Sequence, residues 1–206
     1  DQCQKSWFQF DQFYSDGSFN NALKIIFNTK PKHLLDVGGN TGKFSIRCCE
    51  FNNDVTVSIL DLPGQLKMAE QNIVKTCFQS RINFVPTNVL SPDLLFPKAD
   101  AIWMSQFLDC FSSEEIVAIL KHCTKNMDQE TNLFIMETFW NNQVYDASSF
   151  SLTATSLYFT AMANGNSKMY GLIEFKSLIE KAGLIVEEEH SLVGISHTIL
   201  KCQLSS

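Results

Sequence analysis

Short apolar runs of strand length alternate with segments of helical periodicity along most of this chain, and this alternation limits the possible folds most strongly. The expected strands span residues 33–37, 55–60, 82–85, 99–105 and 133–137. The expected helices span residues 41–51, 63–77, 112–123, 145–164 and 171–182. Repeated strand–helix units predict a parallel sheet with helices on both faces, and ligands of such sheets lie beyond the carboxyl ends of the strands.

The end of the chain departs from this alternation. Residues 184–190 and 197–202 are two further apolar runs with no helix between them, which predicts a closing antiparallel pair. The α/β fold is therefore expected to have a seven-stranded, mostly parallel sheet with an antiparallel last strand. We predict one domain over residues 31–206. Before it, residues 1–30 form a helical, aromatic-rich lead-in that packs on the domain or covers its ligand.

Composition excludes several classes of partner. The formal net charge is -6 and no cluster of Lys and Arg is present, which argues against nucleic acid and against an anionic membrane surface. No apolar run reaches membrane-spanning length and no signal peptide opens the chain. The 7 cysteines show no CxxC pair and no zinc-type spacing, so we expect no metal site and reduced thiols in a cytoplasmic protein.

A glycine-rich stretch, HLLDVGGNTGK, follows the first strand at residues 33–43. A phosphate-binding P-loop is excluded because the glycine spacing is one residue short and Phe44 stands where a magnesium-binding hydroxyl is required. A dinucleotide fingerprint is excluded because Gly38, Asn40 and Gly42 do not give its spacing.

The stretch does match the loop [DE]-x-G-x-G-x-G of class I S-adenosylmethionine (SAM) methyltransferases. Asp36, Gly38 and Gly42 fit this pattern, and Asn40 takes the middle glycine position, where it tolerates a positive φ better than other non-glycine residues do. Such enzymes need a second acid at the end of the second strand, to accept hydrogen bonds from the ribose hydroxyls.

Asp61 stands at that place, in the sequence LDLP. Taken alone, Asp61 also suits the N-cap of the helix that follows. Because Asp36 and Asp61 each end a strand in the right order, the pair favours SAM binding over the cap.

A closer resemblance extends over nearly the whole chain. DVGGNTGK followed by LDLP resembles the small-molecule O-methyltransferases of the plant phenolic and bacterial polyketide type. MANGNSKMYGLIEFKSLIEKAGL resembles the HNPGGKERT-type loop and the next helix of that family. The resemblance implies a Rossmann-like methyltransferase fold, SAM as cofactor, and methyl transfer to a small-molecule acceptor, at a hydroxyl oxygen.

The resemblance and the loop pattern together predict a set of cofactor-binding residues. Asn88 matches a family acid that lies against the adenine, and Val89 is its neighbour against the ring. Ser105 stands where the plant enzymes have a lysine. The whole predicted set is Asp36, Gly38, Gly39, Asn40, Gly42, Asp61, Leu62, Asn88, Val89, Met104, Ser105 and Gln106.

The catalytic positions depart from the family pattern. In LDCFSSE, which matches the family motif LHDWSDE, Asp109 replaces the histidine that acts as base. Glu137 matches a glutamate partner of that histidine, and Met169 takes the second partner position. Asp109 and Glu137 then either share a pocket that raises one pKa and yields a base, or Asp109 caps the next helix and Glu137 ends a strand in water. Phe159, Met162 and Met169 either line an apolar acceptor pocket or belong to the core.

Two functions follow from these observations. The first is a SAM-dependent O-methyltransferase with Asp109 and Glu137 as catalytic residues. The alternative, motivated by the lost histidine, is a catalytically impaired SAM-binding sensor or partner-binding module. Family members usually carry an N-terminal dimerisation domain, so the resemblance identifies this chain as the C-terminal catalytic domain of a protein that forms a homodimer through a domain missing here. The sequence leaves the identity of the acceptor open.

Overall fold

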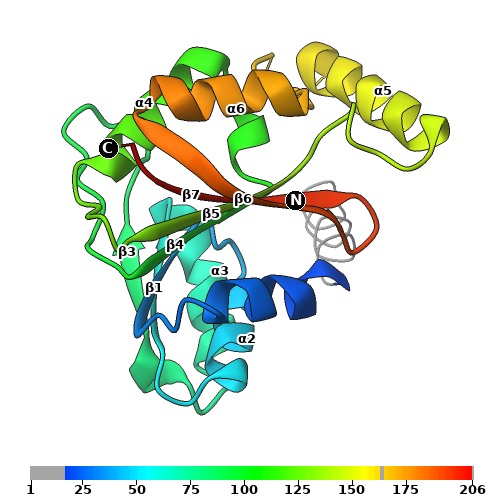
Figure 1. Cartoon of the computed structure of the whole chain (residues 1–206). Coiled ribbons are helices and arrows are strands. Elements are labelled where there is room, and N and C mark those ends of the chain that lie inside the picture. The colour runs from blue at the N-terminus through cyan, green and yellow to red at the C-terminus, as the bar shows by residue number, and fades with distance from the viewer. Residues whose placement is uncertain (1–16, 163–164, 206) are drawn as a thin grey trace.

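The computed structural model describes residues 17–162 and 165–205, and its centre is one seven-stranded sheet (Figure 1). The strands lie in the order β3-β2-β1-β4-β5-β7-β6. Their bounds are β1 (His33–Val37), β2 (Thr56–Asp61), β3 (Ile82–Pro86), β4 (Ala101–Ser105), β5 (Asn132–Thr138), β6 (Leu184–Val193) and β7 (His197–Leu204). The first five strands pair in parallel, and β7 is antiparallel to both β5 and β6. The predicted fold class, including the antiparallel last strand, is confirmed.

Helices cover both faces of this sheet, as Figure 1 shows. The residues 17–27 helix, α2 (Lys43–Phe51) and α3 (Pro63–Ile73) pack on one face. On the other face lie α4 (Ser113–Thr124) and α6 (Leu172–Lys181), while α5 (Asp146–Met162) extends to one side. Two apolar clusters, one on each face, make the core.

The start of α4 shows how the sequence sets a helix boundary. Ser112 is the N-cap: its hydroxyl accepts the N–H of Glu115, and the Glu115 carboxylate accepts the N–H of Ser112. The predicted apolar stripe of α4 is buried in full, at Ile116, Ile119, Leu120 and Cys123.

Within the described residues, two helix boundaries differ from the expected ones by more than one residue. The first helix after β1 begins at Lys43 rather than at residue 41, because the N–H of Gly42 bonds the carbonyl of Gly39 in a preceding turn. The next helix ends at Ile73, since the Thr76 N–H and hydroxyl both bond the Ile73 carbonyl, and Cys77 beyond this turn is exposed.

The described part of the lead-in belongs to the core. Phe19, Ala22, Leu23 and Ile26 of the residues 17–27 helix are buried against the sheet. The aromatic residues between Trp7 and Tyr14 lie outside the described residues, and the domain boundary at residue 31 stays a prediction. Within residues 17–162 and 165–205, no helix has the length and apolar character needed to cross a membrane.

The strand order also locates a crevice. The chain runs outward from β1 through β2 to β3, and then returns to place β4 on the other side of β1. At such a reversal the connections leave the two central strands in opposite directions, which opens a crevice at their carboxyl ends. Val37 and Ser105 mark these ends.

Candidate active site

The glycine-rich loop joins β1 to α2 through an unusual backbone. Gly38, Asn40 and Gly42 have φ values of 71°, 48° and 73°, in the left-handed region that favours glycine and asparagine. A Cβ at Gly38 would collide with the Phe107 ring, and one at Gly39 would lie 2.8 Å from Oδ2 of Asp36. The loop therefore needs its glycines both for its conformation and for close packing.

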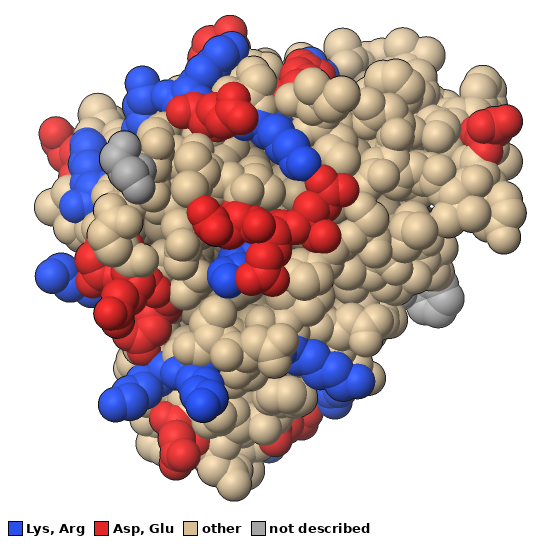
Figure 2. All heavy atoms as spheres, viewed as in Figure 1, with Lys and Arg blue, Asp and Glu red and all other residues tan. Residues whose placement is uncertain are grey.

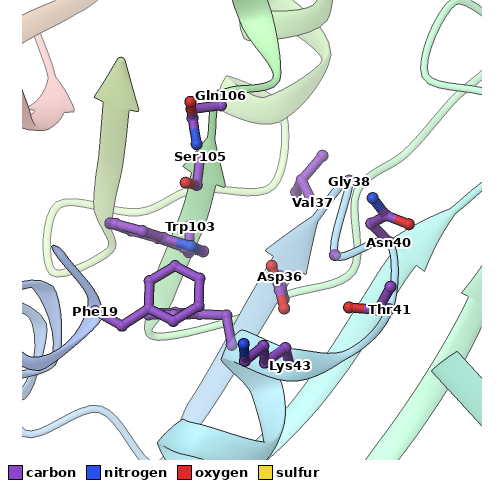
Figure 3. A pocket seen from close by; sticks show the side chains of 12 residues that line it. Phe19, Asp36, Val37, Gly38, Asn40, Thr41, Lys43, Trp103, Ser105 and Gln106 are labelled. Atoms are coloured by element: carbon purple, nitrogen blue, oxygen red, sulfur yellow. The ribbon is translucent and has the colours of Figure 1, made fainter. Parts of the chain in front are cut away.

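A cleft opens over this loop (Figure 3). It is lined by Phe19, Asp36, Val37, Gly38, Gly39, Asn40, Thr41, Lys43, Phe44, Trp103, Ser105 and Gln106. The structure thus brings together much of the predicted cofactor set: Asp36, Gly38, Gly39 and Asn40 from the loop after β1, and Ser105 and Gln106 from the end of β4.

An aromatic group in the cleft was not predicted from the sequence. The ring of Phe44 stacks on Trp103 with centroids 4.6 Å apart, and Phe19 meets Phe44 edge-on at 5.0 Å. Trp103 lies inside an apolar strand and Phe19 comes from a helix before β1, so the neighbouring sequence of neither residue predicts that it lines the cleft. Phe44 directly follows the loop, and this position was the only sequence feature that placed an aromatic ring near the cleft.

Asp36 is the buried acid of the cleft. The Ser45 hydroxyl donates a 2.6 Å hydrogen bond to its Oδ2. Burial raises the pKa of Asp36 to about 7; the Ser45 hydrogen bond lowers this pKa and the charge of Asp61 raises it. Near neutral pH this side chain is therefore present in both protonated and ionised forms.

Asp61 and Asn40 connect the ends of β1 and β2. Asp61 Oδ2 accepts the N–H of Asn40 at 3.0 Å, and Asp61 Oδ1 accepts the N–H of Leu62 at 2.7 Å. Leu62 is the N-cap residue of α3, and no side chain forms a capping hydrogen bond there. The alternative that Asp61 is the N-cap of this helix is therefore wrong. Each carboxylate oxygen keeps room for a further donor. Among the described residues, the buried Oδ1 of Asn40 has no hydrogen-bond partner.

Other predicted cofactor residues lie outside the cleft lining. Leu62 is 49% exposed beyond β2, and the exposed Asn88 uses its Oδ1 to accept the N–H of Leu90 at 3.0 Å. Val89 and Met104 are buried in the core cluster that contains α4, and Gly42 is the N-cap of α2. The cofactor roles of these residues stay predictions.

The two candidate catalytic carboxyls form one electrostatic pair. Glu137, at the end of β5, is buried, and its Oε1 accepts the N–H groups of Phe107 and Leu108 at 3.0 and 2.9 Å. Asp109 is also buried, in the single turn η2 (Leu108–Cys110). Burial, and after it the charge of Asp109, raises the pKa of Glu137 well above its usual range. Ser112 is the N-cap of α4, so Asp109 does not cap that helix. Glu137 is buried, so it is not exposed to water at the end of its strand.

The segment with Met169 lies against this turn. The Lys168 N–H donates to the Asp109 carbonyl at 3.0 Å, and the Thr138 hydroxyl donates to Met169 Sδ at 3.4 Å. By contrast, Phe159 is buried within α5, and Met162 is 74% exposed at the end of that helix. The structure thus brings Met169 close to the candidate base, while a place for Phe159 and Met162 in an acceptor pocket stays a prediction.

Comparison with known proteins gives a consistent picture. The model of the O-methyltransferase domain family matches residues 18–185. Among curated proteins, O-methyltransferase pgmB of Aspergillus terreus (strain NIH 2624 / FGSC A1156) is 27% identical over 183 residues, covering 84% of this chain and 50% of that protein. Norreticuline-7-O-methyltransferase of Papaver somniferum is 26% identical over 177 residues, covering 84% and 45%. This chain therefore spans about half the length of the curated relatives it matches.

Solved structures share the fold at low sequence identity. The O-methyltransferase NcsB1 from neocarzinostatin biosynthesis, in complex with S-adenosylmethionine and 2-hydroxy-5-methyl naphthoic acid, has a TM-score of 0.80 and 19% identity, covering 98% of this chain and 57% of that chain. The mitomycin 7-O-methyltransferase MmcR has a TM-score of 0.80 and 17% identity, covering 98% and 58%.

Proposed function

This chain belongs to the O-methyltransferase domain family, and from that premise we propose that it binds S-adenosylmethionine and transfers the methyl group to a hydroxyl oxygen of a small molecule. The observation that carries the proposal is the arrangement of Asp36, the glycine loop and Asp61 at the carboxyl ends of β1 and β2. The curated relatives act on oxygen by name, and NcsB1 holds both the cofactor and an aromatic acid.

The residues at the cleft fit this cofactor. Asn40 lines the cleft, and its buried Oδ1, which has no partner among the described residues, can accept a hydrogen bond. Asp61 lies outside the cleft lining but is bonded to Asn40 of the loop, and it keeps acceptor capacity beyond its two backbone hydrogen bonds, which suits the paired hydroxyls of a ribose. Gly38 and Gly39 line the cleft, and their lack of a side chain lets the loop pack closely against Phe107 and Asp36.

The chemistry supplied by the bound cofactor is an electrophilic methyl group on a sulfonium. The chain's own contribution is to position the acceptor oxygen in line with that methyl group and to accept the hydroxyl proton. We assign the proton to the carboxylate of Asp109. Glu137 anchors the backbone of the turn by accepting the N–H groups of Phe107 and Leu108, so we assign it the positioning of Asp109 rather than proton transfer.

Calorimetry with SAM and with its demethylated product, S-adenosylhomocysteine (SAH), tests the cofactor assignment. We expect both to bind the chain and Asp61→Ala to abolish binding, because the ribose loses its acceptor. Asp54→Ala, an exposed acid before β2, is the matched control and should bind normally. Absence of SAM and SAH binding at high micromolar concentration would refute the assignment.

Turnover assays test the role of Asp109. Phenols, enols and carboxylates are supplied with SAM, and methylated products are detected by mass spectrometry. Asp109→Asn should lower kcat by roughly 10²- to 10⁴-fold, the usual contribution of a general base, without changing SAM affinity. Glu137→Gln, which keeps a neutral hydrogen-bonding group, should retain most activity. Product formation unchanged in Asp109→Asn would mean that positioning alone supports transfer.

The second candidate function is a SAM-binding sensor or partner-binding module without catalysis. Asp109 at the position of the family's histidine and Met169 at a partner position favour it. Binding of SAM together with no product from any acceptor in the panel would support this alternative over the enzyme.

Assembly and location also remain proposals. We propose that the whole protein is a homodimer, as the resemblance to its family implies, and that it takes no nucleic acid or membrane as partner. A cytoplasmic location is supported by the thiols of Cys48, Cys49, Cys77, Cys123 and Cys202, none of which is in a disulfide.

A further inference from the structure

The first turn of the residues 17–27 helix is tied to the turn between β6 and β7, which Figure 1 shows close to the start of this helix. The buried Ser18 hydroxyl donates to the carbonyl of Val193 at 3.2 Å, and Ser18 Oγ lies 3.0 Å from Nδ1 of His197. Because the hydroxyl has a single proton, which goes to Val193, Nδ1 of His197 is the donor to Ser18. The contact joins residues 175 positions apart in the sequence.

The close approach of the helix to this turn depends on Gly194. Its φ is 67°, and a Cβ there would collide with the Ser18 hydroxyl oxygen. His197 is fully buried, and burial lowers its pKa to about 4, so its imidazole is neutral near pH 7. The turn is also held from another segment, because the Gln143 side chain donates to the Ser196 carbonyl at 3.0 Å. Ser18 therefore binds a fixed part of the molecule.

Phe19, the residue after Ser18, lines the cleft on the side where Trp103 lies (Figure 3). Its ring meets Phe44 edge-on at 5.0 Å, and Phe44 stacks on Trp103. The three rings form one aromatic wall of the cleft. Because Phe19 follows Ser18 directly, the hydrogen bonds of Ser18 determine where this ring lies.

The remainder of the helix is anchored independently of Ser18. Its inner face is buried against the sheet at Ala22, Leu23 and Ile26. These residues lie one to two turns beyond Phe19, so they hold the helix on the sheet without fixing its first turn. Loss of the Ser18 hydrogen bonds should therefore loosen the first turn and leave the fold intact.

We propose that Ser18 and His197 are positioning residues for the cofactor, which hold the Phe19 ring in place as part of the cleft wall. The inference rests on the proposed function, since it takes the cleft to be the SAM site. A ring that is already in place binds a ligand without the cost of being ordered first. Loss of either partner should weaken cofactor binding, although neither residue lines the cleft.

Calorimetry with SAH tests the inference through a double-mutant cycle. Ser18→Ala should weaken SAH binding by roughly 3- to 10-fold, the fold-change that one buried hydrogen bond contributes. Because Ser18 acts through Phe19, the same substitution in a Phe19→Ala chain should cause no further loss. Thr29→Val is the matched control. It removes a hydroxyl that donates to the Ile26 carbonyl at 2.8 Å, just beyond the other end of the helix, and should leave SAH affinity unchanged.

Two variants of His197 test the other side of the contact. His197→Phe keeps a ring of similar size but removes the N–H, and it should weaken SAH binding as Ser18→Ala does. His197→Asn keeps an N–H near the position of Nδ1 and should bind SAH more tightly than His197→Phe. A purely structural role of the ring would give the opposite order, because asparagine leaves the larger cavity.

Contrary results are distinguishable from one another. Unchanged SAH affinity in Ser18→Ala contradicts the inference, and so does an equal loss in the wild-type and Phe19→Ala chains, since Ser18 would then act by another route. If Ser18→Ala does not fold or Phe19→Ala does not bind SAH, the two His197 variants decide. Equal affinities of these two, or tighter binding by His197→Phe, contradict the inference. If the wild-type chain does not bind SAH, the proposed function itself fails.

Discussion

Asp36 shows how a single buried side chain can control the pH dependence of stability. Its pKa is raised from 3.8 to about 7, chiefly by burial. Between pH 3.8 and about pH 7 the Asp36 carboxyl keeps its proton in the native state but has lost it in the unfolded state. The free energy of unfolding therefore includes the full contribution of Asp36 below about pH 4, and this contribution is lost as the pH rises through 7.

Replacing Asp36 by asparagine tests this linkage. Asp36→Asn keeps a group that accepts the Ser45 hydrogen bond and removes the titration. Between pH 5 and pH 8 the wild-type free energy of unfolding should fall relative to that of the variant by about 2 to 3 kcal/mol, at 1.36 kcal/mol for each pKa unit crossed. Denaturant unfolding at several pH values measures this difference. Contributions from His197 and Glu137 are common to both proteins and cancel, and parallel curves for the two proteins would contradict the raised pKa.

At the scale of elements, the loop after β1 and the turn before α4 depend on each other through Gly38 and Phe107. Gly38 and Gly183 both have positive φ values, 71° and 84°, so alanine strains the backbone at each. At Gly183 the added Cβ meets no atom within 4 Å, whereas at Gly38 it collides with the Phe107 ring. Phe107 directly precedes η2, which carries Asp109.

This pair of glycines gives a matched prediction. Gly183→Ala should cost roughly 1 to 2 kcal/mol of stability, the backbone penalty alone. Gly38→Ala should cost about 1 to 3 kcal/mol more because of overpacking against Phe107, and it should also reduce turnover by displacing the turn with Asp109. Thermal unfolding and activity assays measure both effects. Equal losses of stability in the two variants would show that the Phe107 ring moves aside freely.

The elements also show what the sequence can predict. Apolar runs and capping signals such as Ser112 and Glu115 are local, and they located every strand and the start of α4. The end of α3 was placed beyond Ile73 because the apolar stripe continued to Cys77, while the turn that stops the helix depends on Thr76.

The lining of the cleft by Phe19 and Trp103 results from packing between distant segments, which no local pattern encodes. The pairing of Asp109 with Glu137 came from family resemblance. The burial that raises the pKa of Glu137 comes from tertiary packing, which the local sequence does not encode.

At the scale of the whole molecule, α5 exposes several large apolar side chains. Phe150, Leu157 and Met162 are 76%, 70% and 74% exposed, and Asp146 is the only charged residue of the helix. Figure 1 shows α5 extending to one side of the sheet, and Figure 2 shows that the surface there carries few charges. Exposed apolar side chains with few charges around them favour association. We therefore expect the chain to be a monomer in weak, micromolar equilibrium with a dimer.

Sedimentation velocity over a range of concentrations tests this expectation. The double variant Phe150→Gln, Leu157→Gln should remove the association, because it places polar groups on the exposed side of α5. SAM binding should be unaffected, since neither residue lines the cleft. The matched control is Val74→Gln, Leu95→Gln, which changes two residues that are 58% and 62% exposed outside α5 and should leave the association intact. A tight nanomolar dimer would instead require a well-packed interface within these residues, and persistence of any dimer in the α5 variant would place its interface elsewhere.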